Sequence, residues 1–232
     1  MKNATPEWWC KPRFVSLVVD NPSWIMPYVE ELVGQVKAAG DEVRLCKSHD
    51  EVLTGGVAFY LGCVRITPPA VLARNHKNLI IHESALPKGR GFSPLTWQIL
   101  AGNSMVPVTM LEAVDEVDAG DIIYQEEILF EGHELIGEMR QALGQITVDL
   151  CLRYLAEKDP SVGRKQVGEA TFFKRRRPSD SQLDIRKTLA EQFDLLRVVD
   201  NERYPAYFNY QGKCYRLQIE KVDEPMQTGN KK

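Results

Sequence analysis

The first forty residues pair a short apolar run with a longer segment of helical periodicity. Residues 14–20 (Phe-Val-Ser-Leu-Val-Val-Asp) form a compact apolar run, which is typical of a strand buried on both faces. Ser23 follows in an Asn-Pro-Ser break, where we expect it to cap a helix. Residues 24–39 form that predicted helix, and Gly40 ends it. Its apolar positions share one face: Ile25, Val29, Leu32, Val33 and Val36.

The same alternation continues as far as residue 157. The apolar pattern predicts strands and helices in turn, with strands at residues 42–46, 57–61, 79–82, 106–111 and 122–124, and helices at 68–74 and 93–101. The longest helix is predicted over residues 133–157, where one apolar stripe is formed by Ile136, Met139, Leu143, Ile146 and Leu150. Strands that alternate with helices indicate an α/β protein with a Rossmann-like, mostly parallel sheet.

The pattern changes after residue 159. A basic run at residues 174–177 precedes an amphipathic segment at 183–199, and residues 204–219 have the form of a β-hairpin with a Gln-Gly turn. We therefore predict two parts: residues 1–159 as the catalytic domain, and residues 160–232 as a small α+β subdomain that binds substrate and ends in the hairpin. The residues after Asp223 are polar, and we expect them to fray.

Composition and charge narrow the class of protein. Of the 232 residues, 44% are hydrophobic and 26% are charged, which is ordinary for a globular protein. Residues 160–232 carry 15 Lys/Arg and 10 Asp/Glu, whereas residues 1–159 carry 14 and 22. A basic part on an acidic body favours an anionic ligand near their junction.

The sequence indicates neither a membrane partner nor a metal site. No apolar stretch approaches the ~18 residues that span a bilayer, and the N-terminus has no signal-peptide pattern. The five cysteines are scattered without C-x-x-C spacing, so neither a disulfide framework nor a zinc site is indicated. We expect a cytoplasmic protein with no membrane partner and no metal.

The most informative stretch is residues 82–91, His-Glu-Ser-Ala-Leu-Pro-Lys-Gly-Arg-Gly. His82 ends a predicted buried strand, at the carboxyl edge where α/β sheets bind ligands. Asp118 follows 36 residues later, in the acidic loop of residues 114–121. A lone histidine at a strand end is more often structural, and an acidic loop with glycine is usually only a turn. The two together at this interval favour a catalytic pair.

This pair of motifs resembles that of the folate-dependent formyltransferases, whose pattern is Asn-x-His-x-Ser-Leu-Leu-Pro-x-x-Arg-Gly followed by an Asp-x-Gly loop. Residues 60–72 also resemble the family's stretch before its catalytic strand, and the resemblance covers about residues 57–155. It implies 10-formyltetrahydrofolate as formyl donor, with His82 and Asp118 as catalytic residues that stabilise an oxyanion or move a proton. It also implies a pterin pocket lined by Leu61, Gly62, Cys63, Val64, Val114, Asp115 and Glu116.

One position departs from the family pattern. The family's asparagine, two residues before the histidine, is replaced by Ile80. Isoleucine cannot donate a hydrogen bond to an oxyanion, and the loss of one such donor typically costs about 10²–10³ in rate. Asn78 lies on the same strand face but about 6.6 Å further back. Three interpretations stay open: another group supplies the donor, His82 acts alone, or the chain is an impaired homologue that binds folate or a nucleotide.

The C-terminal part resembles that of nucleotide-sugar N-formyltransferases. This implies formylation of a dTDP- or UDP-linked dideoxyamino sugar, for bacterial surface polysaccharide. The predicted substrate-binding residues are Lys88, Arg90, Tyr204, Tyr207 and Phe208, since cations neutralise a pyrophosphate and aromatic rings stack on a base. The basic run can equally be a solvated surface, and the aromatic residues can be apolar packing between hairpin and body.

A methionyl-tRNA formyltransferase is the alternative enzyme, because the same basic run could contact tRNA phosphates. The 73 residues after position 159 are few for a tRNA-binding barrel, so we expect no nucleic acid partner. The hairpin could serve as the surface of a homodimer.

Overall fold

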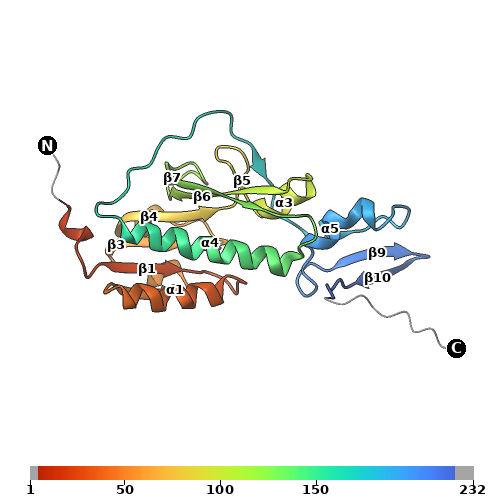
Figure 1. Ribbon diagram of the computed structural model, residues 1–232, viewed down its shortest axis with the longest axis horizontal. Helices are drawn as coiled ribbons and strands as arrows, with labels where there is room; N and C mark the ends of the chain where they lie inside the picture. The colour runs from red at the N-terminus through yellow and green to blue at the C-terminus, as the bar shows by residue number, and fades with distance from the viewer. Residues whose placement is uncertain (1–4, 223–232) are drawn as a thin grey trace.

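Six strands form one sheet in the order β2-β1-β3-β4-β6-β7 in the computed structural model, which describes residues 5–222 (Figure 1). The first four in this order run parallel, whereas β6 is antiparallel to β4 and β7 is antiparallel to β6. The prediction of a mostly parallel α/β sheet is confirmed. The strands are β1 (Phe14–Val18), β2 (Glu42–Cys46), β3 (Gly55–Tyr60), β4 (Asn75–His82), β6 (Met105–Glu112) and β7 (Ile122–Leu129).

Helices connect these strands much as the pattern predicts. The α-helices are α1 (Met26–Ala38), α2 (Pro69–Leu72), α3 (Pro94–Leu100), α4 (Ile136–Ala156) and α5 (Phe193–Val198), and short 3-10 helices are η1 (Glu7–Trp9), η2 (His49–Glu51), η3 (Pro178–Ser181) and η4 (Ala190–Gln192). The prediction that Ser23 caps the first helix is wrong. Ile25 occupies the cap position without a side-chain cap, and Pro27 in the first turn favours the helical start instead.

The two faces of the sheet are covered unequally. Because side chains alternate along a strand, Leu79 and Ile81 of β4 enter the main core with α1 and α4, while Ile80 packs on the opposite face. The predicted stripe of α4 supplies Met139, Leu143 and Leu150 to that main core. The opposite face has a smaller apolar cluster that includes Val18, Ala58, Tyr60 and Val71. His82, two residues after Ile80, projects from this less covered face.

Two short pairings complete the described structure. The hairpin of β9 (Ala206–Tyr210) and β10 (Lys213–Leu217) turns at Gln211–Gly212, as the sequence predicts. Figure 1 shows the segment after α4 returning along the β6–β7 side of the sheet to β8 (Phe172–Phe173), which pairs with β5 (Arg90–Gly91). The division at residue 159/160 stays a prediction, and the tail after Asp223 lies outside the described residues. Within residues 5–222, no helix is both long enough and apolar enough to cross a bilayer.

A buried ion pair ties the start of the sheet to the end of α4. The Arg13 guanidinium lies 2.6 Å from Asp41 Oδ2 and also donates to the Leu155 carbonyl at 2.7 Å. Both side chains are almost fully buried, and the Arg13 backbone N–H donates to the same carboxylate. Burial alone would raise the pKa of Asp41, but the hydrogen bonds from Arg13 outweigh burial and hold that pKa below its ordinary value. Asp41 therefore stays ionised beside Arg13.

Replacing Asp41 with alanine leaves Arg13 as a buried charge without its partner. We expect Asp41→Ala to lower the free energy of unfolding by about 3–5 kcal/mol, measured by chemical denaturation. Glu30→Ala, at an exposed position on α1, is the control and should change this free energy by less than about 0.5 kcal/mol. Equal unfolding midpoints for wild type and Asp41→Ala would show that the pair does not stabilise the fold.

Candidate active site

His82 ends β4 with its imidazole buried against two acceptors. Nε2 lies 2.8 Å from the Gly89 carbonyl oxygen, and Nδ1 lies 3.6 Å from Asp118 Oδ2. A carbonyl oxygen can only accept a hydrogen bond, so Nε2 carries the hydrogen in this geometry and Nδ1 faces the carboxylate. Nδ1 can therefore take up a proton, and the negative charge of Asp118 would stabilise the imidazolium that forms.

Hydrogen bonds hold both the side chain and the backbone of Asp118 in place. It adopts a left-handed conformation with φ 52°, and its Oδ2 accepts a hydrogen bond of 2.8 Å from Gly91 N–H. Gln166 Nε2 donates to the carbonyls of Asp118 and Gly120, at 2.7 and 2.8 Å. The structure thus brings the two predicted catalytic residues together, from positions 36 apart in the chain.

The loop between them is clamped by the segment that follows α4. Thr171 accepts hydrogen bonds from Gly89 N–H at 2.8 Å through Oγ1 and from Arg90 N–H at 2.9 Å through its carbonyl. Gly91 has a φ of 105°, and a Cβ there would lie 2.4 Å from the Phe173 carbonyl oxygen. Glycine is therefore required at this point for the close approach of the two backbones. This clamp places both Gly89 O and Gly91 N–H against the His82–Asp118 pair.

The predicted substrate residues near His82 have different environments. Lys88 is exposed. Arg90 is buried, and its guanidinium donates to Glu116 Oε1 at 2.7 Å and to Gln166 Oε1 at 2.9 Å. In this arrangement Arg90 positions the acidic loop, because its N–H groups bond to Glu116 and Gln166.

The three predicted aromatic residues lie in the hairpin region. Tyr204 lies 5.9 Å from the Arg176 guanidinium, Tyr207 Oη donates to Gln182 Oε1 at 3.3 Å, and Phe208 stacks on Tyr215 at 5.3 Å. Phe208 also packs against the apolar cluster of α5 and the hairpin. These contacts join residues between positions 176 and 215, and a role for the three rings in substrate binding stays a prediction.

The two predicted pterin loops, residues 61–64 and 114–116, carry uncovered apolar side chains. Leu61 is buried and Gly62 is exposed, whereas the side chains of Val64 and Val114 are 41% and 44% exposed. Cys63 is half-buried, Asp115 is exposed, and Glu116 is the partner of Arg90. Val64 and Val114 thus offer exposed apolar surface on the two loops. The pocket itself stays a prediction.

Ile80 packs on the same face of the sheet as His82. It packs between the cluster around Tyr60 and a second cluster that contains Leu86 and Leu111. Asn78 does not replace the missing asparagine, because its Nδ2 donates to the Leu72 carbonyl at 2.8 Å and its Oδ1 accepts from Tyr60 Oη at 3.2 Å. Its amide is occupied within the fold.

Glu83 is a titratable residue that the family motif does not single out, because it fills a variable position of that pattern. It follows His82 directly, and burial raises the pKa of its carboxyl group. The positive charge of His82 opposes this shift, whereas the negative charge of Asp118 adds to it. Burial thus favours the protonated form of this carboxyl group.

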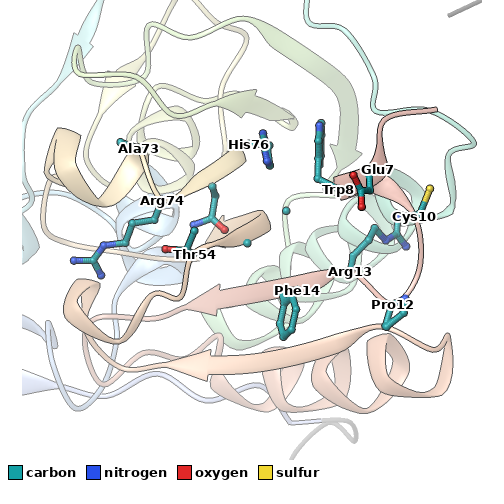
Figure 2. Close-up of a pocket in the computed structure, with 13 residues that line it drawn as sticks. Glu7, Trp8, Cys10, Pro12, Arg13, Phe14, Thr54, Ala73, Arg74 and His76 are labelled. Carbon is teal, nitrogen blue, oxygen red and sulfur yellow. The ribbon is translucent and has the colours of Figure 1, made fainter. Parts of the chain in front are cut away.

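Figure 2 shows a separate pocket of about 430 Å³ at the opposite edge of the sheet. Its lining includes Phe14, Gly55 and Asn75, the first residues of three parallel strands. The Trp8 ring stacks on His76 there, with centroids 4.7 Å apart. None of the predicted site residues lines this pocket, which is therefore distinct from the candidate active site.

Comparison with known proteins links the region around the site to one family. Residues 42–153 match the family model described as formyl transferase. The chain is 30% identical over 145 residues to a methionyl-tRNA formyltransferase from Streptococcus suis, covering 60% of this chain and 45% of that protein. It is 29% identical over 166 residues to the one from Streptococcus gordonii, covering 70% and 53%. The chain therefore spans about half the length of these curated relatives.

Solved structures share the fold across most of the chain. A methionyl-tRNA formyltransferase from Clostridium thermocellum has a TM-score of 0.73 at 21% identity, covering 88% of this chain and 96% of that one. A sugar N-formyltransferase from a Shewanella species has a TM-score of 0.66 at 18% identity, covering 90% and 98%. HypX from Aquifex aeolicus in complex with tetrahydrofolic acid has a TM-score of 0.74 at 18% identity, covering 90% and 38%.

Gly91→Ala tests the backbone clamp. The added Cβ would meet the Phe173 carbonyl in a left-handed conformation, so we expect the variant to lose about 1–3 kcal/mol of unfolding free energy. Hydrogen exchange of the amides of residues 89–92 should also become faster. Gly137→Ala, on α4 with no heavy atom within 4 Å of the added Cβ, is the control and should be neutral or slightly stabilising. If both variants have the stability and the amide hydrogen exchange of the wild type, the contact between Gly91 and Phe173 does not require glycine.

The raised pKa of Glu83 predicts a pH-dependent stability difference. In the folded state Glu83 holds its proton to higher pH than in the unfolded state, so stability falls as pH rises through that window. We expect Glu83→Gln to match wild type near about pH 4 and to be more stable near about pH 8. Thermal unfolding across this range measures the difference, and Glu127→Gln, at an exposed position on β7, is the control. A difference that is constant with pH would contradict the prediction.

Proposed function

We propose that the chain transfers a formyl group from 10-formyltetrahydrofolate to an amine, because its residues 42–153 match the formyl transferase family model. The observation that carries this proposal is the buried His82–Asp118 pair at the end of β4, with Nδ1 and Oδ2 3.6 Å apart. Both residues lie inside the matched region. Residues 61–64 and 114–116 are the proposed walls of the donor's pterin pocket.

His82 and Asp118 would have different roles in proton transfer. When bound, the donor supplies the formyl carbon and accepts a proton at N10 as tetrahydrofolate leaves. His82 would take the proton of the attacking amine and return it to the leaving nitrogen. Asp118 would stabilise the imidazolium between these two events, and the hydrogen bond from Nε2 to Gly89 O would keep the ring in place.

The developing charge on the formyl oxygen still needs a hydrogen-bond donor. Ile80 has none, and the amide of Asn78 is occupied. The first of the three interpretations, in which another group supplies this donor, therefore stays open.

The proposed acceptor is the amino group of a nucleotide-linked dideoxyamino sugar, for bacterial surface polysaccharide. Cations at the mouth of the site support an anionic substrate. The Arg175 guanidinium lies 4.2 Å from the Phe92 ring and donates to the Val64 carbonyl at 3.2 Å, so the basic run contacts the proposed pterin loop. Lys174 lies 5.0 Å from the Trp97 ring and pairs with Asp180 at 2.8 Å, whereas Lys88 is exposed in the loop that follows His82. The similarity to a sugar N-formyltransferase over 98% of its length also supports this acceptor.

Methionyl-tRNA is the second candidate acceptor, since the curated relatives are methionyl-tRNA formyltransferases. Exposed Arg177 and Lys174 would then contact phosphates of the tRNA. Salt dependence separates the two acceptors, because binding of a tRNA through several phosphates weakens steeply as salt rises.

A turnover assay tests the proposed reaction directly. We expect purified protein with 10-formyltetrahydrofolate to formylate dTDP- or UDP-linked amino sugars, with product detected by mass spectrometry. His82→Ala should reduce kcat by about 10²–10⁴-fold, because the proton acceptor is lost. His133→Ala, at an exposed position beyond the site, is the control.

The outcomes separate the alternatives. Turnover with methionyl-tRNA but with no amino sugar would replace the proposed acceptor. Folate binding without turnover on either acceptor would identify an impaired homologue, and a gain in rate for Ile80→Asn would show that a donor is missing.

A further inference from the structure

Three side chains of different chemistry meet at the carboxyl edge of the sheet, outside the His82–Asp118 pair. Asp20 follows β1, His49 lies in η2 between β2 and β3, and Cys63 follows β3. A carboxylate oxygen, an imidazole nitrogen and Sγ of these residues all lie within 4.8 Å of one another. The side chains of Asp20 and His49 are only 1% and 10% exposed. These are three ligand types that borderline-soft metal ions accept together.

The separations suit a metal better than direct hydrogen bonds. Asp20 Oδ2 lies 3.9 Å from His49 Nε2, which is beyond hydrogen-bond range. Ligands about 2.0–2.3 Å from a tetrahedral Zn²⁺ ion lie roughly 3.3–3.8 Å from one another. The cluster therefore needs movements of about 1 Å or less to reach coordination geometry, and three protein ligands leave a fourth position for water.

The charge at the cluster also favours a cation. The Asp20 carboxylate accepts hydrogen bonds from the Asn21 side chain and from the backbone N–H groups of Val64 and Arg65. Within residues 5–222, His49 is the only basic side chain within ion-pair distance of it. The same hydrogen bonds orient the carboxylate, as outer-shell partners do in metal sites.

We propose that Asp20, His49 and Cys63 bind one divalent transition-metal ion, with Zn²⁺ as the best match to the donor set. On binding, the Sγ–H bond breaks, the proton goes to solvent and an Sγ–metal bond forms, with no change of oxidation state. The thiol gives up its contact of 3.3 Å with the Val18 carbonyl in this step. The ion would fasten the loops after β1, β2 and β3 to one another, including the loop of residues 61–64.

Cobalt titration of the metal-free full chain tests the proposal, because a cobalt–thiolate bond gives a charge-transfer absorption in the near ultraviolet. We expect one Co²⁺ per chain with this absorption, and one Zn²⁺ per chain by mass spectrometry after gel filtration. Cys63→Ser should abolish the charge-transfer band, and His49→Gln should weaken binding at least about tenfold. Cys10→Ser and His133→Gln, both at exposed positions outside the cluster, are the matched controls.

Two results would overturn the site. One is a wild-type protein that binds no cobalt through thiolate and retains no zinc. The other is a charge-transfer band that persists in Cys63→Ser while circular dichroism shows the variant to be folded. Neither readout requires folate or formyl transfer, so failure here leaves the proposed function standing, and failure of the turnover assay leaves the metal site standing.

Discussion

The candidate active site depends on the contact between residues 89–92 and residues 171–173. Through this contact Gly89 presents its carbonyl to His82 Nε2, and Gly91 presents its N–H to the Asp118 carboxylate. Two glycines make the approach possible, and the Thr171 hydroxyl and carbonyl complete it. The His82–Asp118 pair is thus held from outside the region that matches the family model, because β8 lies beyond residue 153. The segment after α4 is therefore part of the architecture of the site.

Strong periodic patterns explain what the sequence predicted well. The apolar runs of β1 to β4 and the stripe of α4 reflect burial in one core, so their positions follow from local spacing. His82 and Asp118 were found through the motif pair, and the structure places them together. The β5–β8 pair has only two residues on each strand and no periodic signal. The contact of Arg90 with Gln166 likewise has no local signature, because the two residues lie 76 positions apart in the chain.

The replacement at Ile80 has a consistent physical setting on the less covered face of the sheet. An apolar side chain there joins two small clusters that flank β4. The replacement removes a hydrogen-bond donor from the strand, and Asn78 does not supply another, because its amide is bonded to Leu72 and Tyr60.

Both proposed sites lie at the carboxyl edge because parallel strands all deliver their following loops there. Asp20 connects them: its carboxylate belongs to the metal-type cluster and also accepts the N–H groups of Val64 and Arg65 beside the proposed pterin loop. The basic run reaches this loop from the other side, through the hydrogen bond of Arg175 to the Val64 carbonyl. The acidic body and the basic segment thus meet at one loop, where Asp20 and Arg175 both bond to the backbone of Val64. A cation bound by Asp20 would lower the negative potential on the body side of that loop, which favours an anionic substrate at the same edge.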